Sequence, residues 1–283
     1  MTTYSARTIL SKAGKRLKRF GIDQPLLDAR LLLAFALELE DAQFSGQDNL
    51  LISPPNLATF KMLVLRRCNH EPVSRIIGRR YFWNLDVKLT SVALDPRSDS
   101  ETLIESLLSE FPNKQNKLKI LDLGTGTGCL LLSALSEYPN ASGIGIDSSA
   151  NCVKLAKENA VRNQLKDRAQ FQVGDWTKNL SERFDVILCN PPYISTAQIS
   201  QLEPEVAIHD PMIALNGGQD GLDCYRALSI GLSDVLNQTG KIFLELGTEQ
   251  TKNVQNIMET AGLTSLKTAI DIGGRERCLV LTN

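Results

Sequence analysis

The sequence predicts an α/β protein in which a parallel sheet is wrapped by helices, with a small all-α bundle and a β-hairpin in front of it. Three observations lead to this fold class. From residue 118 onward, strand-like apolar runs and helical segments mostly alternate, which is typical of a parallel sheet. Before that, residues 1–80 carry apolar side chains at helical spacing. A chain of 283 residues also favours one large domain with a smaller companion.

The N-terminal bundle, residues 1–80, is predicted from three helical segments. In the first, residues such as Ile9, Ala13 and Leu17 recur on one face, while lysines and arginines mostly occupy the other. The second begins at Pro25, a residue suited to a first helical turn, and the third runs from about Leu57 to Cys68. Residues 1–80 hold 13 Lys and Arg against 7 Asp and Glu. This excess indicates an acidic partner or a nucleic acid, although a solvated helix face accounts for the KAGKRLKR run equally well.

Residues 81–97 are predicted to form a β-hairpin linker at the start of the second domain, which spans 81–283. Side chains alternate along this stretch, with Val87 and Leu89 on the same face. Ser98 and Glu101 then have the spacing of a capping box for the helix SETLIESLLSEF.

The second domain is expected to hold seven strands, and its last two, without a helix between them, are predicted to pair as a hairpin. Gly240 is predicted to cap the helix that precedes the fifth strand. The expected strands are 118–123, 141–147, 169–174, 184–189, 241–247, 265–271 and 277–282.

Composition excludes several classes of protein. The longest apolar run, Leu31 to Leu37, is far shorter than the roughly 20 residues that span a bilayer. The start, MTTYSARTIL, lacks the pattern of a secretory signal, so a cytoplasmic location is expected. The six cysteines include no CxxC pair and there are only two histidines, so neither a metal site nor a disulfide framework is expected.

A glycine-rich turn, DLGTGTG (122–128), lies between the first strand of this domain and the next helix. Its glycines let the backbone approach a ligand closely, and the helix offers free N–H groups. A dinucleotide site would need G-x-G-x-x-G, but residue 129 is a cysteine. The spacing Gly124, Gly126, Gly128 resembles motif I of S-adenosylmethionine (SAM) methyltransferases, whose sheet is Rossmann-like. Asp147 ends the second strand, where a carboxylate can accept both ribose hydroxyls of SAM or NAD.

The stretch CNPPYIS (189–195) follows the fourth strand. Two successive prolines cannot continue a central strand, and ligands of such sheets sit beyond the strand ends. The tetrapeptide from Asn190 to Tyr193 resembles the (N/D)PP(Y/F) motif of methyltransferases that act on planar nitrogen. The Asn190 side-chain carbonyl and the Pro191 backbone carbonyl could accept the two N–H bonds of such a nitrogen, and Pro191 and Pro192 stiffen the backbone. Tyr193 offers a ring face for a flat amide or base.

The motif alone leaves adenine N6, guanine N2 and glutamine N5 open as acceptors. Nearly the whole chain, however, is similar to the peptide chain release factor glutamine methyltransferases (PrmC/HemK family). Besides GTGTG and NPPYI, the matching pieces are EPVSRIIGRRYFW (71–83), DPRSDSETLIE (95–105) and EPEVAIHDPMIALNGGQDGLDCYR (203–226).

The resemblance implies a class I SAM-dependent methyltransferase domain that methylates N5 of the glutamine in the GGQ tripeptide of class 1 release factors. It implies that the last of these pieces supplies the lid and substrate wall, and that residues 1–80 dock the release factor. A monomer without a metal, a membrane contact or direct nucleic-acid binding is expected. Residues implied to contact SAM are Gly124, Thr125, Gly126, Thr127, Gly128, Asp147, Trp176 and Asn190, and the implied catalytic pocket residues are Asn190, Pro191, Pro192 and Tyr193.

The sequence departs from the family in two places that bear on the pocket wall. The usual PRPDTE reads PRSDSE, preceded by Asp95 in place of an apolar residue, and His209-Asp210 replaces a common Tyr-Glu. Among competing readings, a DNA or RNA amino-methyltransferase would need stacking aromatics, which are few in residues 1–80 and fall mostly at apolar helical positions. A SAM-binding regulatory protein that has lost catalysis would not need Asn190 and Tyr193.

Overall fold

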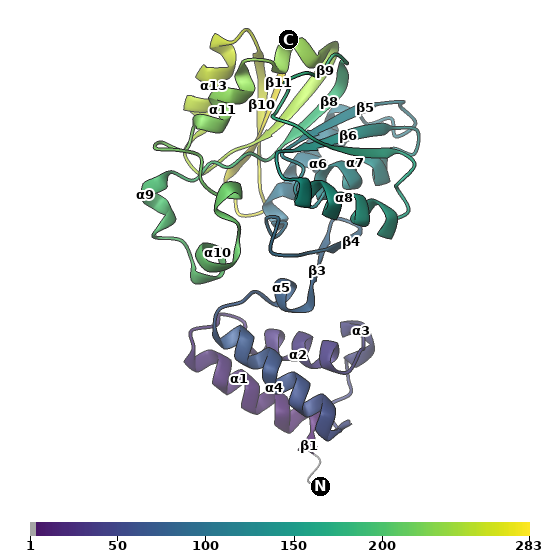
Figure 1. Cartoon of the computed structure of the whole chain (residues 1–283), viewed down its shortest axis with the longest axis vertical. Coiled ribbons are helices and arrows are strands. Elements are labelled where there is room, and N and C mark those ends of the chain that lie inside the picture. Colours follow the sequence, from purple (N-terminus) through teal and green to yellow (C-terminus); the bar gives the residue numbers. More distant parts are fainter. Residues whose placement is uncertain (1–3) are drawn as a thin grey trace. The chain divides into compact units, whose positions relative to one another are not determined.

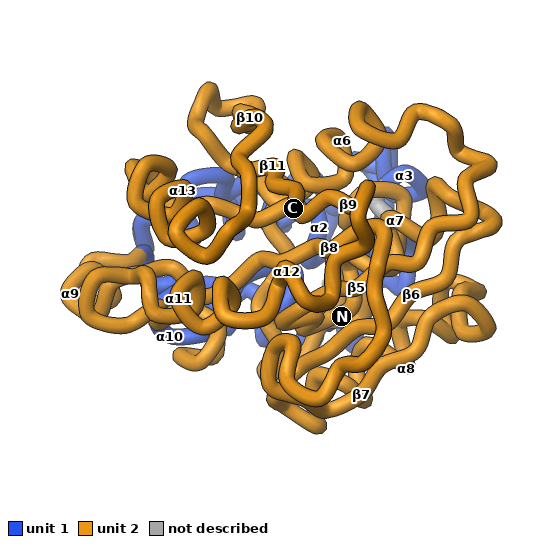
Figure 2. The backbone as a smooth tube through the Cα atoms, turned by 90° about the horizontal axis from the view of Figure 1, so that it is seen from above, with its two compact units in different colours: residues 1–78, 203–209 blue, residues 79–202, 210–283 orange. Residues whose placement is uncertain are grey.

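A computed structural model describes residues 4–283 of the chain (Figure 1). The backbone separates into two compact units (Figure 2). The first contains residues 4–78 together with Glu203–His209, and the second contains Arg79–Leu202 and Asp210–Asn283. Sequence reasoning did not anticipate that residues 203–209, which lie far along the chain, belong with the N-terminal helices.

The first unit is helical, with a core of leucines, alanines and a few aromatics such as Phe60. Ser5 and Ser53 cap the helices α1 and α4 by accepting hydrogen bonds from Thr8 N and Asn56 N, and Pro25 lies in the first turn of α2 as predicted. Its elements are β1 (Tyr4–Ser5), α1 (Ala6–Arg19), α2 (Pro25–Ala36), α3 (Asp41–Phe44), β2 (Leu51–Ile52), α4 (Pro54–Cys68), α5 (Val73–Ile77) and α10 (Pro204–His209).

Helix α10 is held in the first unit by a buried ion-pair cluster. The guanidinium of Arg67, which is only 7% exposed, donates to Asp28 Oδ2 at 2.7 Å and to Glu205 Oε1 at 2.9 Å. His70 Nδ1 lies 3.2 Å from the same oxygen of Glu205. A buried charge needs such partners, because an unpaired one would carry a large desolvation cost.

The second unit contains a seven-stranded sheet in the order β10-β11-β9-β8-β5-β6-β7. Strand β11 runs antiparallel to both of its neighbours, and the other pairs are parallel. The fold class predicted from the sequence is therefore confirmed. The strands are β5 (Lys119–Leu123), β6 (Ser142–Asp147), β7 (Ala169–Val173), β8 (Phe184–Cys189), β9 (Leu236–Glu245), β10 (Thr264–Ile270) and β11 (Glu276–Thr282).

Helices cover both faces of this sheet and create two apolar cores (Figure 1). On one face lie α6 (Glu101–Glu110), α7 (Cys129–Glu137) and α8 (Ala150–Arg162). On the other lie α11 (Asp223–Ser229), α12 (Leu232–Val235) and α13 (Thr251–Thr260). The predicted hairpin is present as β3 (Arg79–Phe82) and β4 (Leu85–Lys88). Two further short helices, α9 (Thr196–Ile199) and the 3-10 turn η2 (Met212–Ala214), precede α11.

Two local predictions were wrong. The capping box does not form, because Ser98–Ser100 makes a 3-10 turn and Glu101 Oε1 instead accepts a hydrogen bond from Trp83 N at 2.7 Å. Gly240 does not end a helix but lies inside β9. A Cβ at Gly240 would stand only 2.9 Å from the Phe184 carbonyl oxygen, so the strand passes too close there for a side chain. No helix within residues 4–283 combines the length and apolar character needed to cross a bilayer.

Candidate active site

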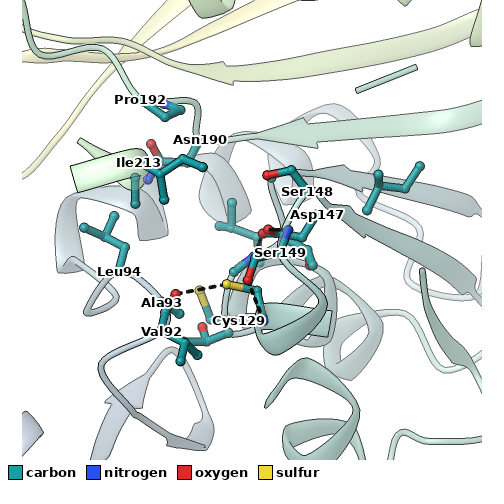
Figure 3. Close-up of a pocket in the computed structure, with 18 of the residues that line it drawn as sticks. Val92, Ala93, Leu94, Cys129, Asp147, Ser148, Ser149, Asn190, Pro192 and Ile213 are labelled. Carbon is teal, nitrogen blue, oxygen red and sulfur yellow. Dashed lines mark hydrogen bonds between the residues drawn. The ribbon is translucent and has the colours of Figure 1, made fainter. Parts of the chain in front are cut away.

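A cavity of about 350 Å³ lies at the carboxyl ends of β5, β6, β7 and β8 (Figure 3). Each of these strands contributes the residues that follow it, which is where open parallel sheets bind ligands. The turn Gly124–Thr127 follows β5, and Trp176 and Asn190 follow β7 and β8. Asp147 is the last residue of β6, and Ser148 comes directly after it. Figure 3 shows Asn190 and Pro192 at one end of the cavity and Asp147 and Ser148 at another.

The glycine turn has a backbone that other residues would adopt only with strain. Gly124 has φ +71° and Gly126 has φ +54°, both in the left-handed region. The N–H groups of Gly124 and Thr125 both donate to Ile146 O at 2.9 Å, which ties the turn to β6. A Cβ at Gly124 would already lie 3.6 Å from the Trp176 ring. The bare backbone therefore forms part of the cavity wall.

Gly128 was expected to contact the cofactor, but it is not among the residues that line the cavity. It precedes α7 with φ +82°, and a Cβ there would lie 3.1 Å from Ala156 Cβ and 3.3 Å from the Phe171 ring. In the structure, this glycine allows the turn to pack closely against α8 and β7.

The Asp147 carboxylate is fixed by backbone donors at the end of β6. Its Oδ2 accepts from Gly126 N at 2.9 Å and its Oδ1 accepts from Ser149 N at 2.8 Å. Each carboxylate oxygen can accept more than one hydrogen bond, so a neighbouring pair of hydroxyls could still be held. The geometry suits the diol of a ribose.

Asp122 lies beneath the glycine turn and is almost completely buried. Its Oδ2 accepts a hydrogen bond from the Thr125 hydroxyl. Burial raises the pKa of this carboxyl to about 7, against the lowering effect of the Thr125 bond, and the charge of Asp147 adds to the rise. The turn thus rests on a carboxyl group that titrates near neutral pH.

Trp176 adopts a left-handed backbone, with φ +49°, which is uncommon for a bulky residue. Its side chain lines the cavity beside Gly124 and packs in part against the core on the α11 side of the sheet. The flat ring is therefore presented to the cavity, where an aromatic ligand could lie against it. The adjacent Asp175 also lines the cavity and pairs with Lys178 at 2.5 Å.

The four residues of the NPPY stretch face different surroundings. Asn190 and Pro192 line the cavity, whereas Pro191 is buried and Tyr193 is not among the lining residues. Asn190 Nδ2 donates to Ser100 Oγ at 3.0 Å. The Tyr193 hydroxyl donates to Glu245 Oε1 at 3.2 Å, and burial raises the pKa of this phenol far above its usual value. The tyrosine ring was expected to face a substrate, and that role stays a prediction.

The chain beyond α10 folds back beside the NPPY loop. Ile194 N donates to Leu215 O at 3.0 Å, and Gly217 N donates to Ile194 O at 2.8 Å. This contact places Ile213, Ala214 and Asn216 in the cavity wall.

Two of the residues that depart from the family pattern, Asp95 and Asp210, lie in contact near this wall. Asp210 forms an ion pair with Arg97, and its Oδ1 accepts a hydrogen bond from Asp95 N at 3.2 Å. Both aspartates are buried. The contact joins the loop after the hairpin, which also contributes Val92 and Pro96 to the cavity, to the segment after α10.

Three cysteines in the cavity wall do not form a reactive centre. Burial raises the pKa of Cys129 to about 12 and that of Cys152 to about 11, so both thiols stay protonated at neutral pH. Cys152 Sγ donates to Val92 O at 3.1 Å, and Cys224 completes the set. Among residues 4–283, no three His, Cys, Asp or Glu side chains gather closely enough to hold a metal ion.

The structure thus brings most of the predicted site residues to one cavity, namely Gly124, Thr125, Gly126, Thr127, Asp147, Trp176, Asn190 and Pro192. Sequence reasoning missed two contacts of the NPPY stretch: Asn190 donates to Ser100, the last residue of the 3-10 turn before α6, and Tyr193 donates to Glu245 at the end of β9. Ser100 lies in the stretch DPRSDSETLIE, which resembles the family, so the sequence did contain a signal for it. Glu245 lies in an expected strand, and its surrounding sequence shows no sign of a functional role.

Two domain families match the chain. Residues 8–78 match the PrmC N-terminal domain, and residues 97–215 match the methyltransferase small domain. A release factor glutamine methyltransferase from Rhodospirillum rubrum is 42% identical over 272 residues, which cover 96% of this chain and 83% of that protein. Another from Caulobacter vibrioides is 40% identical and covers 95% of this chain and 93% of that protein.

Solved structures support the fold. The T. thermophilus 16S rRNA N2 G1207 methyltransferase, determined in complex with AdoMet and guanosine, aligns with a TM-score of 0.50 at 20% identity. The alignment covers 72% of this chain and 49% of that chain, and at this identity it bears on the fold alone. The seven-stranded mixed sheet is that of the class I SAM-dependent methyltransferases. The full-length relatives confirm the resemblance read from the sequence, and the chain belongs to the release factor glutamine methyltransferase (PrmC/HemK) family.

Proposed function

We propose that this chain transfers a methyl group from SAM to N5 of the glutamine in the GGQ tripeptide of class 1 release factors. The full-length relatives named as release factor glutamine methyltransferases support this choice of acceptor, and one observation of the site supports the chemistry. Asn190 lies in the cavity wall with its Nδ2 bound to Ser100, which leaves its side-chain carbonyl as an acceptor for a substrate N–H.

The residues present fit the adenosyl part of SAM. The turn from Gly124 to Thr127, which has no side chain at its two glycines, supplies a narrow floor. Asp147 offers carboxylate oxygens for a ribose, and Trp176 offers a flat ring for adenine. When bound, SAM supplies a methyl carbon attached to a sulfonium, which is a good leaving group.

The protein's part in the proposed reaction is to position the acceptor. An amide nitrogen is a weak nucleophile because its lone pair is shared with the carbonyl. The Asn190 side-chain carbonyl and the Pro191 backbone carbonyl would each accept one of its N–H bonds, which holds the nitrogen in place and keeps electron density on it. Because Pro191 is buried and followed by a second proline, these acceptors are held rigidly before the substrate arrives. Alignment of nitrogen with the methyl carbon then supplies most of the rate.

Residues 1–80 are proposed as the surface that docks the release factor. In support, α1 carries an exposed basic face opposite its buried residues. That face consists of Lys12, Lys15, Arg16, Lys18 and Arg19. We propose that the chain acts as a monomer.

The test is direct. The purified chain is incubated with isotopically labelled SAM and either a release factor, the same factor with its GGQ glutamine replaced by alanine, or nucleic acid. We expect label only on the intact release factor, and peptide mass spectrometry should place the methyl group on the glutamine amide. Label on adenine N6 or guanine N2 would overturn the proposal and favour a nucleic-acid amino-methyltransferase.

A further inference from the structure

The backbone of the NPPY loop has few hydrogen-bond donors of its own. Pro191 and Pro192 have no N–H group, so the backbone nitrogens of these residues cannot tie the loop to its surroundings. Before the prolines, the loop is anchored by β8, whose last residue, Cys189, pairs with Leu244 of β9. The carbonyl groups proposed to bind the substrate amide therefore depend on what holds the chain after the prolines.

The side chain of Gln250 supplies a contact after the prolines. Its Nε2 donates to Tyr193 O at 2.9 Å and makes a longer hydrogen bond to Gly221 O at 3.4 Å. Both partners are backbone carbonyls, which only accept hydrogen bonds, so the NH₂ end of the Gln250 amide must face them. One side chain thus joins the NPPY loop to the segment before α11, which contributes Ala214 and Asn216 to the cavity wall.

Two glycines leave room for this amide. A Cβ at Gly221 would stand 2.4 Å from Tyr193 O and 2.7 Å from Gln250 Nε2. A Cβ at Gly247, which follows β9, would stand 2.3 Å from Gln250 Oε1 and 2.9 Å from the Tyr193 ring. A side chain at either glycine would displace the glutamine amide or the loop. Three segments of the chain therefore pack closely around the Gln250 amide.

A purely local role does not explain Gln250. It directly precedes α13, but its side chain makes no capping hydrogen bond to that helix. Its Oε1 is buried and has no hydrogen-bond partner among residues 4–283. A buried acceptor without a donor costs stability, so this side chain is not the best choice for stability alone.

We infer that Gln250 is a positioning residue for the methyl transfer, a role that rests on the proposed function. By holding the Tyr193 carbonyl, it fixes the end of the loop that carries the acceptors proposed for the substrate amide, on Asn190 and Pro191. Gln250 is not among the residues that line the cavity, so it acts through the loop and does not touch the substrate.

The first experiment measures the methylation kinetics of Gln250→Met and Gln250→Glu. Methionine keeps the length of the side chain without an N–H group, and an ionised glutamate keeps the shape of the amide without a donor. Both changes leave the Tyr193 carbonyl without its donor from this side chain. We expect each variant to lower kcat for the release factor about tenfold, with KM changed less than threefold, because alignment is lost while docking is retained.

Gln255→Met is the matched control, because Gln255 is a half-buried glutamine within α13 itself. Its kcat should stay within twofold of the wild type. If Gln250 only filled space, Gln250→Met would also behave as the wild type, because methionine fills a similar volume. The comparison of these two variants therefore separates the hydrogen bond from packing.

The second experiment separates a change in the loop from a loss of folded protein. The number of SAM sites and the SAM affinity of each variant are measured by calorimetry, and kcat is expressed per SAM-binding site. We expect a SAM affinity within threefold of the wild type, because the glycine turn, Asp147 and Trp176 are unchanged. A loss of folded molecules then lowers the number of sites but not this kcat.

Several results would overturn the inference. These are a Gln250→Met variant with kcat per site within twofold of the wild type, a kcat loss of the same size in Gln255→Met, or a fall in SAM affinity that accounts for the whole effect. If the wild type labels a base and not glutamine, the proposed function fails, but the same kcat ratios on that acceptor still decide the role of Gln250. A wild type that labels neither acceptor would overturn both proposals.

Discussion

Replacing Asp122 by asparagine should make the protein's stability less sensitive to pH. Asp122 is buried beneath the glycine turn, and its pKa is raised from 3.8 to about 7, mainly by burial. A carboxyl whose pKa is raised in the folded state binds its proton more tightly there than in the unfolded chain. Its contribution to stability is therefore greatest below pH 4 and is lost as the pH rises through about 7.

The size of this loss follows from the shift. One pKa unit corresponds to about 1.4 kcal/mol, so the rise from 3.8 to about 7 amounts to roughly 4 kcal/mol in total. Roughly 2.5 kcal/mol of this stability is lost between pH 5 and pH 8, because the rest of the loss has already occurred below pH 5. Asparagine does not titrate, so the Asp122→Asn variant should not show this pH-dependent loss of stability.

The assay is urea denaturation of the wild type and Asp122→Asn at pH 5, 6, 7 and 8. At each pH, the free energy of unfolding of the wild type is subtracted from that of Asp122→Asn. Burying the asparagine amide changes this difference by the same amount at every pH, so it does not affect the trend with pH. We expect that difference to change by roughly 2.5 kcal/mol in favour of the variant from pH 5 to pH 8. The exposed Asp167, changed to asparagine, is the control. A difference that stays constant with pH to within about 0.5 kcal/mol would refute the reasoning about Asp122.

Three further outcomes are expected. Asn190→Ala should reduce turnover at least about 100-fold, the scale of one positioned transition-state contact, while calorimetric SAM affinity changes less; normal methylation by this variant would contradict its proposed role. Gly145→Ala should lower the free energy of unfolding by about 1–3 kcal/mol, because the new Cβ would stand 2.6 Å from Phe171 Cδ1; an unchanged urea midpoint would count against this packing. Tyr138→Phe should cost about 1 kcal/mol in the same assay, because the buried hydroxyl donates to Phe111 O at 2.8 Å; equal stability would show that this bond contributes nothing.

The site is assembled from segments that lie far apart in the sequence. Asn190 and Ser100 are 90 positions apart, and Tyr193 and Glu245 are 52 positions apart. Strand β8 lies between β9 and β5 in the sheet, so Tyr193, which follows β8, meets Glu245 at the end of β9. The same connection between β8 and β9 also carries α10, whose Glu205 pairs with Arg67 in the helical unit. One stretch of chain therefore contributes both to the cavity wall and to the first unit.

Patterns confined to a few residues were sufficient to predict the strands, the glycine turn and the end of β8. Glycine tolerates the left-handed φ values that Gly124 and Gly126 adopt, because it has no Cβ. Proline has no N–H to donate, which is why Pro191 and Pro192 end the strand. Where the backbone conformation follows from the residue type and from the spacing of apolar residues, the sequence by itself determined the local structure. The fold class and the position of Asn190 beside the cavity belong to this group.

Only the tertiary structure decided the features that depend on distant partners. Gly240 was expected to cap a helix, yet it allows β9 to approach Phe184, and Glu101 binds the hairpin at Trp83 in place of capping its own helix. The hydrogen bond from Asn190 to Ser100 and the inclusion of α10 in the first unit were likewise not predictable from the sequence. A buried polar group takes whichever partner the packed fold places beside it, and that partner leaves no signal in the neighbouring sequence.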